Sequence, residues 1–313
     1  MLLNEMNAKV NEPLVSVGVI SYNSSDYILD VLESIKAQTY PNIELIISDD
    51  KSPDNTVEIC KEWISKNKER FVRVEIIVPE RNTGTAGNYN RALFDSTGEW
   101  MKFIDADDLL LPNCLEDDVQ FVRNNPEAKV VFSDILYFSN PYKLSGKHFV
   151  SKEEKEFFKK NAHEQLMVVL KKNHIPPSSS FIKMDVLKAN PYKEEYILME
   201  DTPKWIDLLN KGYKFYYFDK VTTGYRICNS VTRNRVHYYS PLFVECIYKF
   251  LWMEQMNLIK EYKNQEAYNY QLKQMLKIEL TFGLLNNKRS FLHDILFFCI
   301  RVFVKFCTKF KIP

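Results

Sequence analysis

Hydrophobic residues along the first part of the chain follow two alternating spacings. Five short runs rich in β-branched residues have the composition of strands that are buried on both faces. These runs are residues 14–20, 43–48, 74–78, 100–104 and 129–137. Between them, apolar residues recur every three or four positions, which predicts intervening helices. Strands that alternate with helices form crossover connections, so we expect a mainly parallel sheet with helices on both faces.

The pattern changes after residue 140. A charged amphipathic helix is expected over residues 151–172, followed by short strands at 181–184, 213–218 and 221–227. From residue 240 onward the spacing is helical throughout, with breaks near Lys263 and Asn287. We therefore expect an α/β domain over residues 1–235 and an α-helical extension over residues 236–313.

Composition narrows the function classes. The chain has 313 residues, 45% of them apolar, and its 42 basic and 41 acidic residues give a net charge of +1. No overall charge attracts it to nucleic acid, so we expect no nucleic-acid partner. Six scattered cysteines without a C-x-x-C pair indicate reduced thiols in a cytoplasmic protein. We expect neither a signal peptide nor a membrane-spanning helix, because no apolar run approaches ~20 residues.

Polar residues collect where three of the predicted strands end. Ligands of doubly wound sheets bind outside the carboxyl ends of the strands, so these segments mark the expected site. The segments are Ser21-Tyr22-Asn23, Ser48-Asp49-Asp50 and Asp105-Ala106-Asp107-Asp108. The chain contains neither a G-x-G-x-x-G nor a G-x-x-x-x-G-K-[ST] motif, which argues against dinucleotide dehydrogenases and P-loop NTPases.

Asp105 and Asp107 are two positions apart on an extended segment, so both carboxylates can point to one side. Paired carboxylates favour a divalent cation such as Mg²⁺ or Mn²⁺, which also binds phosphate oxygens. The alternative is a solvated turn in which Asp108 or Asn113 caps the following helix. These residues taken alone favour the alternative.

Several segments, taken in order, resemble the inverting glycosyltransferases of family 2, which have the GT-A fold. The resemblance covers residues 14–232, and its specificity lies in the order of motifs that are each weak alone. They include Val15-Ser16-Val17, Gln38-Thr39-Tyr40-Pro41-Asn42, Arg81-Asn82-Thr83-Gly84, Glu200-Asp201 and the three strand-end segments. The family implies an α/β fold with a mainly parallel, Rossmann-like sheet flanked by helices. Residues 1–110 would then bind the nucleotide sugar and residues 111–235 the acceptor.

The resemblance also assigns roles at the strand ends. Asp50 would accept a hydrogen bond from the ring N–H of the donor's base, as a carboxylate can. Asp107 would hold the Mn²⁺ or Mg²⁺ that joins the donor phosphates, and Gly84 would let the backbone approach the nucleotide. The donor-binding residues that the family implies are Ser21, Tyr22, Asn23, Asp50, Asn82, Gly84, Asn90, Asp105 and Asp107.

Asp201 has two interpretations. An acid at the start of a helix with Pro in its first turn is a common N-cap, and the residues alone favour this role. The match to the family's Glu-Asp-x-x-x-Trp pattern favours a general base instead. Such a base is needed because a sugar hydroxyl is too weakly acidic to attack unaided at neutral pH. Glu200 and Trp205 would then support the base or contact the acceptor.

The segment from Tyr225 onward also resembles the family, in which Tyr-Arg is often followed by a His two residues later. Here Arg226 is present and is expected to contact the acceptor or a phosphate. Cys228 occupies the histidine position, which leaves a third metal ligand open. Arg233 or His237 could bind the diphosphate in its place. A solvated basic turn is an equally good interpretation.

The resulting hypothesis is a metal-dependent, inverting glycosyltransferase that uses a nucleotide sugar, expected to be a UDP-sugar. Its acceptor would be a hydroxyl of a glycan or lipid-linked oligosaccharide in surface polysaccharide synthesis. Two alternatives stay open: a catalytically silent glycan- or nucleotide-binding protein on the same fold, and a nucleotidyltransferase. A nucleotidyltransferase would require a Gly-rich, basic loop near residues 14–23, which the sequence lacks.

The C-terminal region has a charge excess of its own. Residues 286–313 contain six Lys or Arg and one acid, a net charge of 6 − 1 = +5. Residues 291–310 are mostly apolar, with charges near one stripe at helical spacing, which predicts a helix in the membrane interface. Peripheral contact with the inner face of the cell membrane is therefore expected. The alternative is a helix that packs on the catalytic domain or on a second subunit, so a homodimer stays open.

Overall fold

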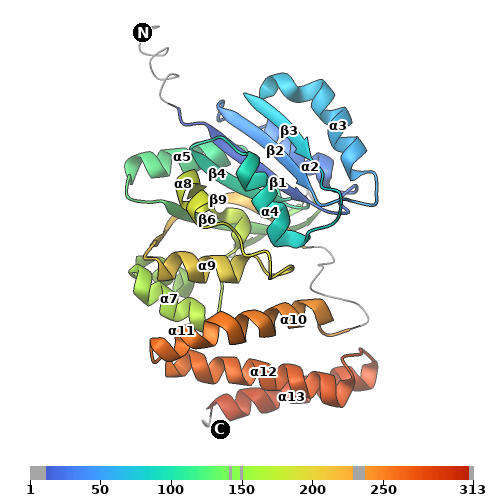
Figure 1. Ribbon diagram of the computed structural model, residues 1–313, viewed down its shortest axis with the longest axis vertical. Coiled ribbons are helices and arrows are strands. Elements are labelled where there is room, and N and C mark those ends of the chain that lie inside the picture. The colour runs from blue at the N-terminus through green and yellow to red at the C-terminus, as the bar shows by residue number, and fades with distance from the viewer. Residues whose placement is uncertain (1–11, 141–142, 149–150, 228–236, 310–313) are drawn as a thin grey trace. The chain divides into compact units, whose positions relative to one another are not determined.

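The computed structural model describes residues 12–140, 143–148, 151–227 and 237–309 (Figure 1). The chain divides into two compact units. The first comprises residues 1–165 and 175–227, and the second comprises residues 166–174 and 228–313. The domain boundary predicted at residue 235 lies among residues 228–236, outside the described residues. The sequence pattern gives no sign that residues 166–174 belong to the second unit.

The first unit is built on a nine-stranded sheet, in which the four leading strands are parallel. Their order across the sheet is β3-β2-β1-β4. They are β1 (Val15–Ser21), β2 (Ile43–Asp49), β3 (Arg73–Ile77) and β4 (Trp100–Asp105). Every residue of β1 and β2 is buried, which accounts for their high content of Val and Ile.

The other half of the sheet has mixed directions. From β4 the order continues β8-β6-β9-β5, with β7 paired to β6; β4–β8 and β8–β6 are antiparallel and β6–β9 is parallel. These strands are β5 (Leu109–Leu110), β6 (Val130–Asn140), β7 (Lys143–His148), β8 (Phe181–Lys183) and β9 (Phe215–Arg226). The mainly parallel α/β fold is confirmed.

One prediction about this half is wrong. The two short strands predicted at residues 213–218 and 221–227 form the single strand β9. Its pairing with β6 is irregular beside Asp134, where Tyr217 and Val221 face Phe132 and Asp134. The exposed pair Asp219-Lys220 lies within this bulge, so its polarity resembles a turn although the strand continues.

Helices cover both faces of the parallel strands. Val15, Val17 and Val19 of β1 belong to a core shared with α2 (Ile28–Lys36), α3 (Thr56–Asn67) and α5 (Cys114–Asn124). The opposite face carries Phe103, whose ring lies 4.8 Å from that of Tyr89 on α4 (Gly84–Asp95). This arrangement is the expected one for crossover connections, and Figure 1 shows the helices beside the sheet.

The helix predicted over residues 151–172 is two helices, α6 (Lys152–Lys159) and α7 (Ala162–Lys171). A capping box joins Ser151 and Glu154 at the start of α6. Asn161 and Glu164 exchange the same reciprocal backbone bonds at the start of α7. The second capping pair ends the first helix, because Asn161 takes a non-helical cap position. Two further helices are α8 (Met184–Ala189) and α9 (Asp201–Asn210).

The second unit is helical, with breaks where the sequence predicts them. Lys263, Asn286 and Asn287 have positive φ angles of 52°, 49° and 54° and separate the helical segments. The segments are α10 (Pro241–Phe250), the π-helical turn η3 (Leu251–Gln255), α11 (Met256–Glu261), α12 (Gln265–Leu285) and α13 (Phe291–Lys309). No helix within the described ranges has the length and apolar character needed to span a bilayer.

Side-chain amides explain why the second half of α7 belongs to this unit. Gln255 donates to the carbonyl oxygen of Leu170 at 2.8 Å, and Asn264 donates to that of Met167 at 3.0 Å. Gln271 donates to the carbonyl oxygens of Leu170 and Lys171 at 3.0 Å. The bonds to Leu170 and Lys171 satisfy carbonyl groups at the end of α7, which have no partner within the helix.

Candidate active site

The carboxyl ends of three parallel strands meet at one edge of the sheet. The register pairs Ser21 of β1 with Asp49 of β2, and Ile20 of β1 with Asp105 of β4. The acidic segments predicted to line one edge therefore lie side by side, as parallel strands require.

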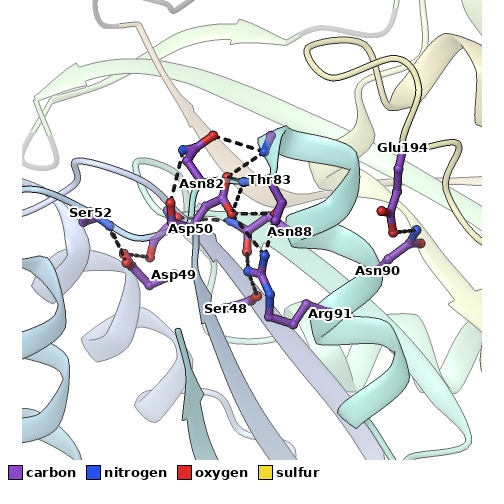
Figure 2. Close-up of polar contacts among 12 residues, drawn as sticks. Ser48, Asp49, Asp50, Ser52, Asn82, Thr83, Asn88, Asn90, Arg91 and Glu194 are labelled. Atoms are coloured by element: carbon purple, nitrogen blue, oxygen red, sulfur yellow. Dashed lines mark hydrogen bonds and ion pairs between the residues drawn. The ribbon is translucent and has the colours of Figure 1, made fainter. Parts of the chain in front are cut away.

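Asp50, directly after β2, is held by donors from the start of α4. It is 2% exposed and accepts hydrogen bonds from the amides of Thr83 (3.0 Å) and Gly84 (2.8 Å) (Figure 2). The Thr83 hydroxyl donates to it at 2.7 Å and Arg91 Nη2 at 3.0 Å. These donors use the carboxylate's acceptor positions, so a base N–H would have to displace one of them. Base recognition by Asp50 stays a prediction.

Arg91 is a residue that the sequence interpretation missed. Besides Asp50, its guanidinium donates to Ser48 Oγ at 3.1 Å and to Asn88 Oδ1 at 2.9 Å (Figure 2). It thereby ties α4 to the end of β2. The sequence feature that could have identified Arg91 is its position beside Ala92 and Leu93, in a helix whose neighbouring residues are buried.

The three residues after β1 differ in their accessibility. Ser21 is 1% exposed, and its hydroxyl donates to Asp49 Oδ2 at 2.8 Å, so it lies inside the fold. Tyr22 is 50% exposed at the edge of the sheet. Asn23 has a positive φ of 55° and donates its amide to Ser52 Oγ. Of the three, Tyr22 has the ring that a nucleotide base could stack on.

The acidic turn after β4 contains Asp105 and Asp107, whose metal binding stays a prediction. The Tyr89 hydroxyl donates to Asp105 Oδ1 at 3.0 Å, another contact that the sequence pattern does not reveal. Burial raises the pKa of Asp105 to about 7, and the negative charges of Asp107 and Asp201 add to this shift. Burial also raises the pKa of Asp108 well above its ordinary value, with further contributions from Asp105 and Asp107.

Asp108 does not cap the following helix. It is 1% exposed, and its Oδ1 accepts a hydrogen bond from the amide of Arg226, at the end of β9, at 2.9 Å. Asn113 precedes α5 but makes no side-chain capping bond. The alternative of a solvated turn capped by Asp108 or Asn113 is therefore wrong.

Arg226 fastens the acidic turn from the other side. Its Nε donates to the carbonyl oxygen of Asp107 at 2.7 Å, and its Nη2 donates to Asp30 Oδ2 at 2.8 Å. The guanidinium carbon lies 4.8 Å from the ring centroid of Tyr27 and 4.6 Å from that of Phe138. The predicted role in acceptor or phosphate binding would require this group to leave these partners.

Glu200 and Asp201 stand at the start of α9 and complete the cluster of acids. Asp201 Oδ1 accepts hydrogen bonds from the amide and hydroxyl groups of Thr202. The pKa of Glu200 is raised to about 8. Burial is the largest cause, and the negative charges of Asp201 and Asp105 add to it. The two neighbouring acids therefore favour binding a proton between them. The fold brings acids from two distant chain segments within electrostatic range of one another.

Residues 190–200, here called the 190–200 segment, precede α9 in the chain and make contact with α4. The side-chain amide of Asn90 donates to the carbonyl oxygen of Tyr192 at 2.9 Å and accepts from the Tyr192 backbone N–H at 2.8 Å. It also donates to Glu194 (Figure 2). Gly84 has a φ of +81°, and a Cβ there would lie 2.3 Å from Ile197 Cγ2. The close approach that requires glycine is made by Ile197, whereas the sequence interpretation attributes it to a nucleotide. Donor contact by Asn82 and Asn90 stays a prediction.

Of the other predicted acceptor or phosphate residues, the structure places Trp205 in the core of the first unit. Trp205 is 1% exposed, and its ring packs at 5.1 Å and 5.7 Å from those of Phe132 and Phe215. It is a core residue of the first unit, which explains why it cannot meet an acceptor directly. His237 belongs to the second unit, where it pairs with Lys288. Arg233, like Cys228, lies outside the described residues.

The acidic turn is compatible with a divalent cation. No group of three or more His, Cys, Asp or Glu side chains in the described ranges could hold a metal by itself. Mg²⁺ and Mn²⁺ are commonly held by one or two carboxylates together with substrate phosphates, which fits Asp105 and Asp107. A cation there would also offset the repulsion that contributes to the raised pKa of Asp105.

Fold, acidic turn and order of motifs together define a glycosyltransferase of the GT-A type. A family profile described as glycosyl transferase family 2 matches residues 16–189, and the chain belongs to this family. It is 31% identical over 228 residues to the Escherichia coli UDP-Glc:alpha-D-GlcNAc-diphosphoundecaprenol beta-1,3-glucosyltransferase WfaP, covering 71% of this chain and 81% of the relative. The family assignment decides against the nucleotidyltransferase alternative.

Solved structures support the same fold. The chain resembles Staphylococcus aureus TarS 1-349 in complex with UDP-GlcNAc, with a TM-score of 0.57, 17% identity and coverage of 84% of this chain and 81% of TarS 1-349. It also resembles the mannosyltransferase PcManGT of Pyrobaculum calidifontis in complex with GDP-Man and Mn²⁺. That match has a TM-score of 0.53 and 14% identity, and it covers 100% of this chain and 95% of PcManGT. The enzyme is thus a glycosyltransferase of a family whose members use nucleotide sugars.

Proposed function

We propose that the enzyme transfers one sugar from a UDP-sugar to a hydroxyl group of a lipid-linked glycan, with inversion at the anomeric carbon. The donor class is supported by WfaP and the TarS complex, whose descriptions name UDP-Glc and UDP-GlcNAc. The acceptor class is supported by the diphosphoundecaprenol in the name of WfaP. The reaction would serve surface polysaccharide synthesis at the cytoplasmic face of the membrane.

The observation that carries this proposal is the convergence of the Asp105–Asp108 turn with Glu200 and Asp201. In the proposed step the acceptor oxygen forms a bond to the anomeric carbon while the bond from that carbon to the diphosphate oxygen breaks. The hydroxyl proton passes to the Asp201 carboxylate. We assign this role to Asp201 because it matches the acid of the family's Glu-Asp-x-x-x-Trp pattern.

Asp107, with Asp105 beside it, would hold the divalent cation, which supplies positive charge to the departing diphosphate when bound. Tyr22 is exposed at the edge of the sheet and would stack on the base. Asp50 and Arg91 would act by fixing the loop at residues 82–84. These roles follow the position of each side chain around the carboxyl edge.

Replacement of the proposed base tests the mechanism directly. We expect Asp201→Asn to lower transfer by at least about 10²-fold while UDP binding stays near wild type, because a base acts on the acceptor. Transfer is measured with a soluble acceptor analogue, and UDP binding by calorimetry. Asp207→Asn, on the same helix and paired with Lys211, is the matched control. Transfer by Asp201→Asn at the wild-type rate would make Asp201 a helix cap and refute the mechanism.

A further inference from the structure

The last helix of the chain, α13, has two apolar faces with different surroundings. One face packs inside the second unit: Ile300 and Val304 are each 6% exposed and form a cluster with Tyr238 and Leu285. The Phe297 ring stacks on that of Tyr238 at 4.2 Å, and the Tyr238 hydroxyl donates to Asp294 at 2.6 Å. Figure 1 shows α13 running alongside α12. This face is therefore accounted for by the fold.

The other face is apolar and exposed. It carries six large side chains that are each about half exposed or more: Leu292, Ile295, Phe298, Val302, Phe303 and Phe306. At 3.6 residues per turn, Ile295, Val302 and Phe306 lie roughly half a turn around the helix from Ile300 and Val304. Soluble surfaces seldom gather so many large apolar groups, and a contiguous patch of this kind marks an interaction site.

Positive charge accompanies this face. Residues 286–313, which include α13, contain six Lys or Arg and one acid, and Arg301 and Lys288 are exposed. An exposed apolar helix face in a segment with an excess of basic residues is the pattern of helices that lie in the headgroup region of anionic bilayers. In a two-fold dimer the same face would meet itself and bring these cations toward their own copies.

We propose that the exposed face of α13 is a membrane-docking surface that inserts at the level of the headgroups of an anionic bilayer, with the helix parallel to the bilayer plane. The buried face keeps α13 attached to its own unit during docking. This inference deepens the proposed function, because it names the surface through which the enzyme would reach a lipid-linked acceptor. Its test does not depend on transfer activity.

The test uses the full-length protein and co-sedimentation with vesicles of phosphatidylcholine alone or with phosphatidylglycerol. We expect binding to the vesicles that contain phosphatidylglycerol and weaker binding to the neutral vesicles. The double variant Ile295→Glu/Val302→Glu should bind at least about tenfold less, because it removes two inserted side chains and adds two anions. Its melting temperature and UDP binding should match wild type, since both positions are exposed.

Val72→Glu is the matched control, because Val72 is 63% exposed and belongs to the first unit, whereas the exposed face of α13 belongs to the second. It should bind vesicles like wild type. The proposal is overturned if wild-type protein ignores both kinds of vesicle, or if the double variant binds as wild type does. It is also overturned if the wild type is a dimer by light scattering and the double variant is a monomer, because a second copy then covers the face. If the wild-type protein binds vesicles but transfers no sugar, that result would instead contradict the proposed function alone.

Discussion

Arg226 is the residue on which the structure changes the interpretation most. Its side chain and its own amide hold the carbonyl of Asp107 and the carboxylate of Asp108, while Asp30 balances its charge. A guanidinium can make these bonds at once because its donors form a planar fork. We therefore interpret Arg226 as a positioning residue for the acidic turn.

Substitution of Arg226 should weaken metal-dependent donor binding. We expect Arg226→Gln to weaken UDP binding in the presence of Mn²⁺ by about 10- to 100-fold, the range for loss of a buried hydrogen bond to a charged group. Calorimetry with Mn²⁺ and with EDTA measures the effect. Asp30→Asn keeps the bond to Asp107 and should lose much less. Equal losses in the two variants would mean that the ion pair, and not the contact with Asp107, matters.

Asp105 should make metal binding depend on pH. Its pKa is raised from 3.8 to about 7, so below pH 7 the folded protein carries an extra proton that competes with a cation. Mn²⁺-dependent UDP binding should rise between about pH 6 and pH 8. Between about pH 4 and pH 7 the unliganded fold progressively loses stability, because the folded state still holds a proton that the unfolded state has released. Calorimetry between pH 6 and pH 8 should show a flat profile of Mn²⁺-dependent UDP binding for Asp105→Asn, and an unchanged slope would exclude Asp105 as the source.

At the scale of elements, the 190–200 segment contacts α4 and leads into α9, the helix of the proposed base. It therefore links the loop at residues 82–84, which precedes α4, with that helix. The amide of Thr85 donates to the carbonyl oxygen of Ile197 at 2.9 Å, beside Gly84. Asn90 holds the same segment further along α4. The position of α9 relative to α4 thus depends on close backbone packing.

Alanine substitutions at two glycines with positive φ distinguish the cost of backbone strain from the cost of disturbing this packing. Gly212→Ala should cost about 1–2 kcal/mol, because its φ is +87° but nothing lies within 4 Å of an added Cβ. Gly84→Ala should cost about 1–3 kcal/mol more, since its Cβ would also overlap Ile197. Thermal unfolding of both variants measures the difference. A Gly84→Ala variant no less stable than Gly212→Ala would show that the 190–200 segment moves aside freely.

At the scale of the whole molecule, the enzyme is assembled from two units that each have their own core. The first contains the sheet and every acid of the candidate site, and the second contains the exposed face of α13. The proposed donor site and the proposed docking face therefore belong to different units and can be tested with separate variants.

A ligand that binds the native state should stabilise the protein only when its partner ion is present. We expect UDP with Mn²⁺, at about 100 times its dissociation constant, to add about 2.7 kcal/mol of stability. For a domain of about 200 residues this raises the melting temperature by roughly 5–10 °C. EDTA should abolish the shift, and GDP in place of UDP should give a smaller one. A full shift from UDP in EDTA would exclude metal-dependent donor binding.

The sequence by itself determined the parallel strands, the three C-terminal helical segments and the edge of the sheet where acids gather. These follow from local patterns, because a strand buried on both faces must be apolar throughout and parallel strands end at one edge. The partners of the polar side chains were decided only by the tertiary structure. Lys102, inside an otherwise apolar strand, is fully buried and lies 3.2 Å from Asp118 of α5, and Asp50 is held by α4. Such pairs form between segments distant in sequence, and a charge buried in a core is stable only where the fold supplies its partner.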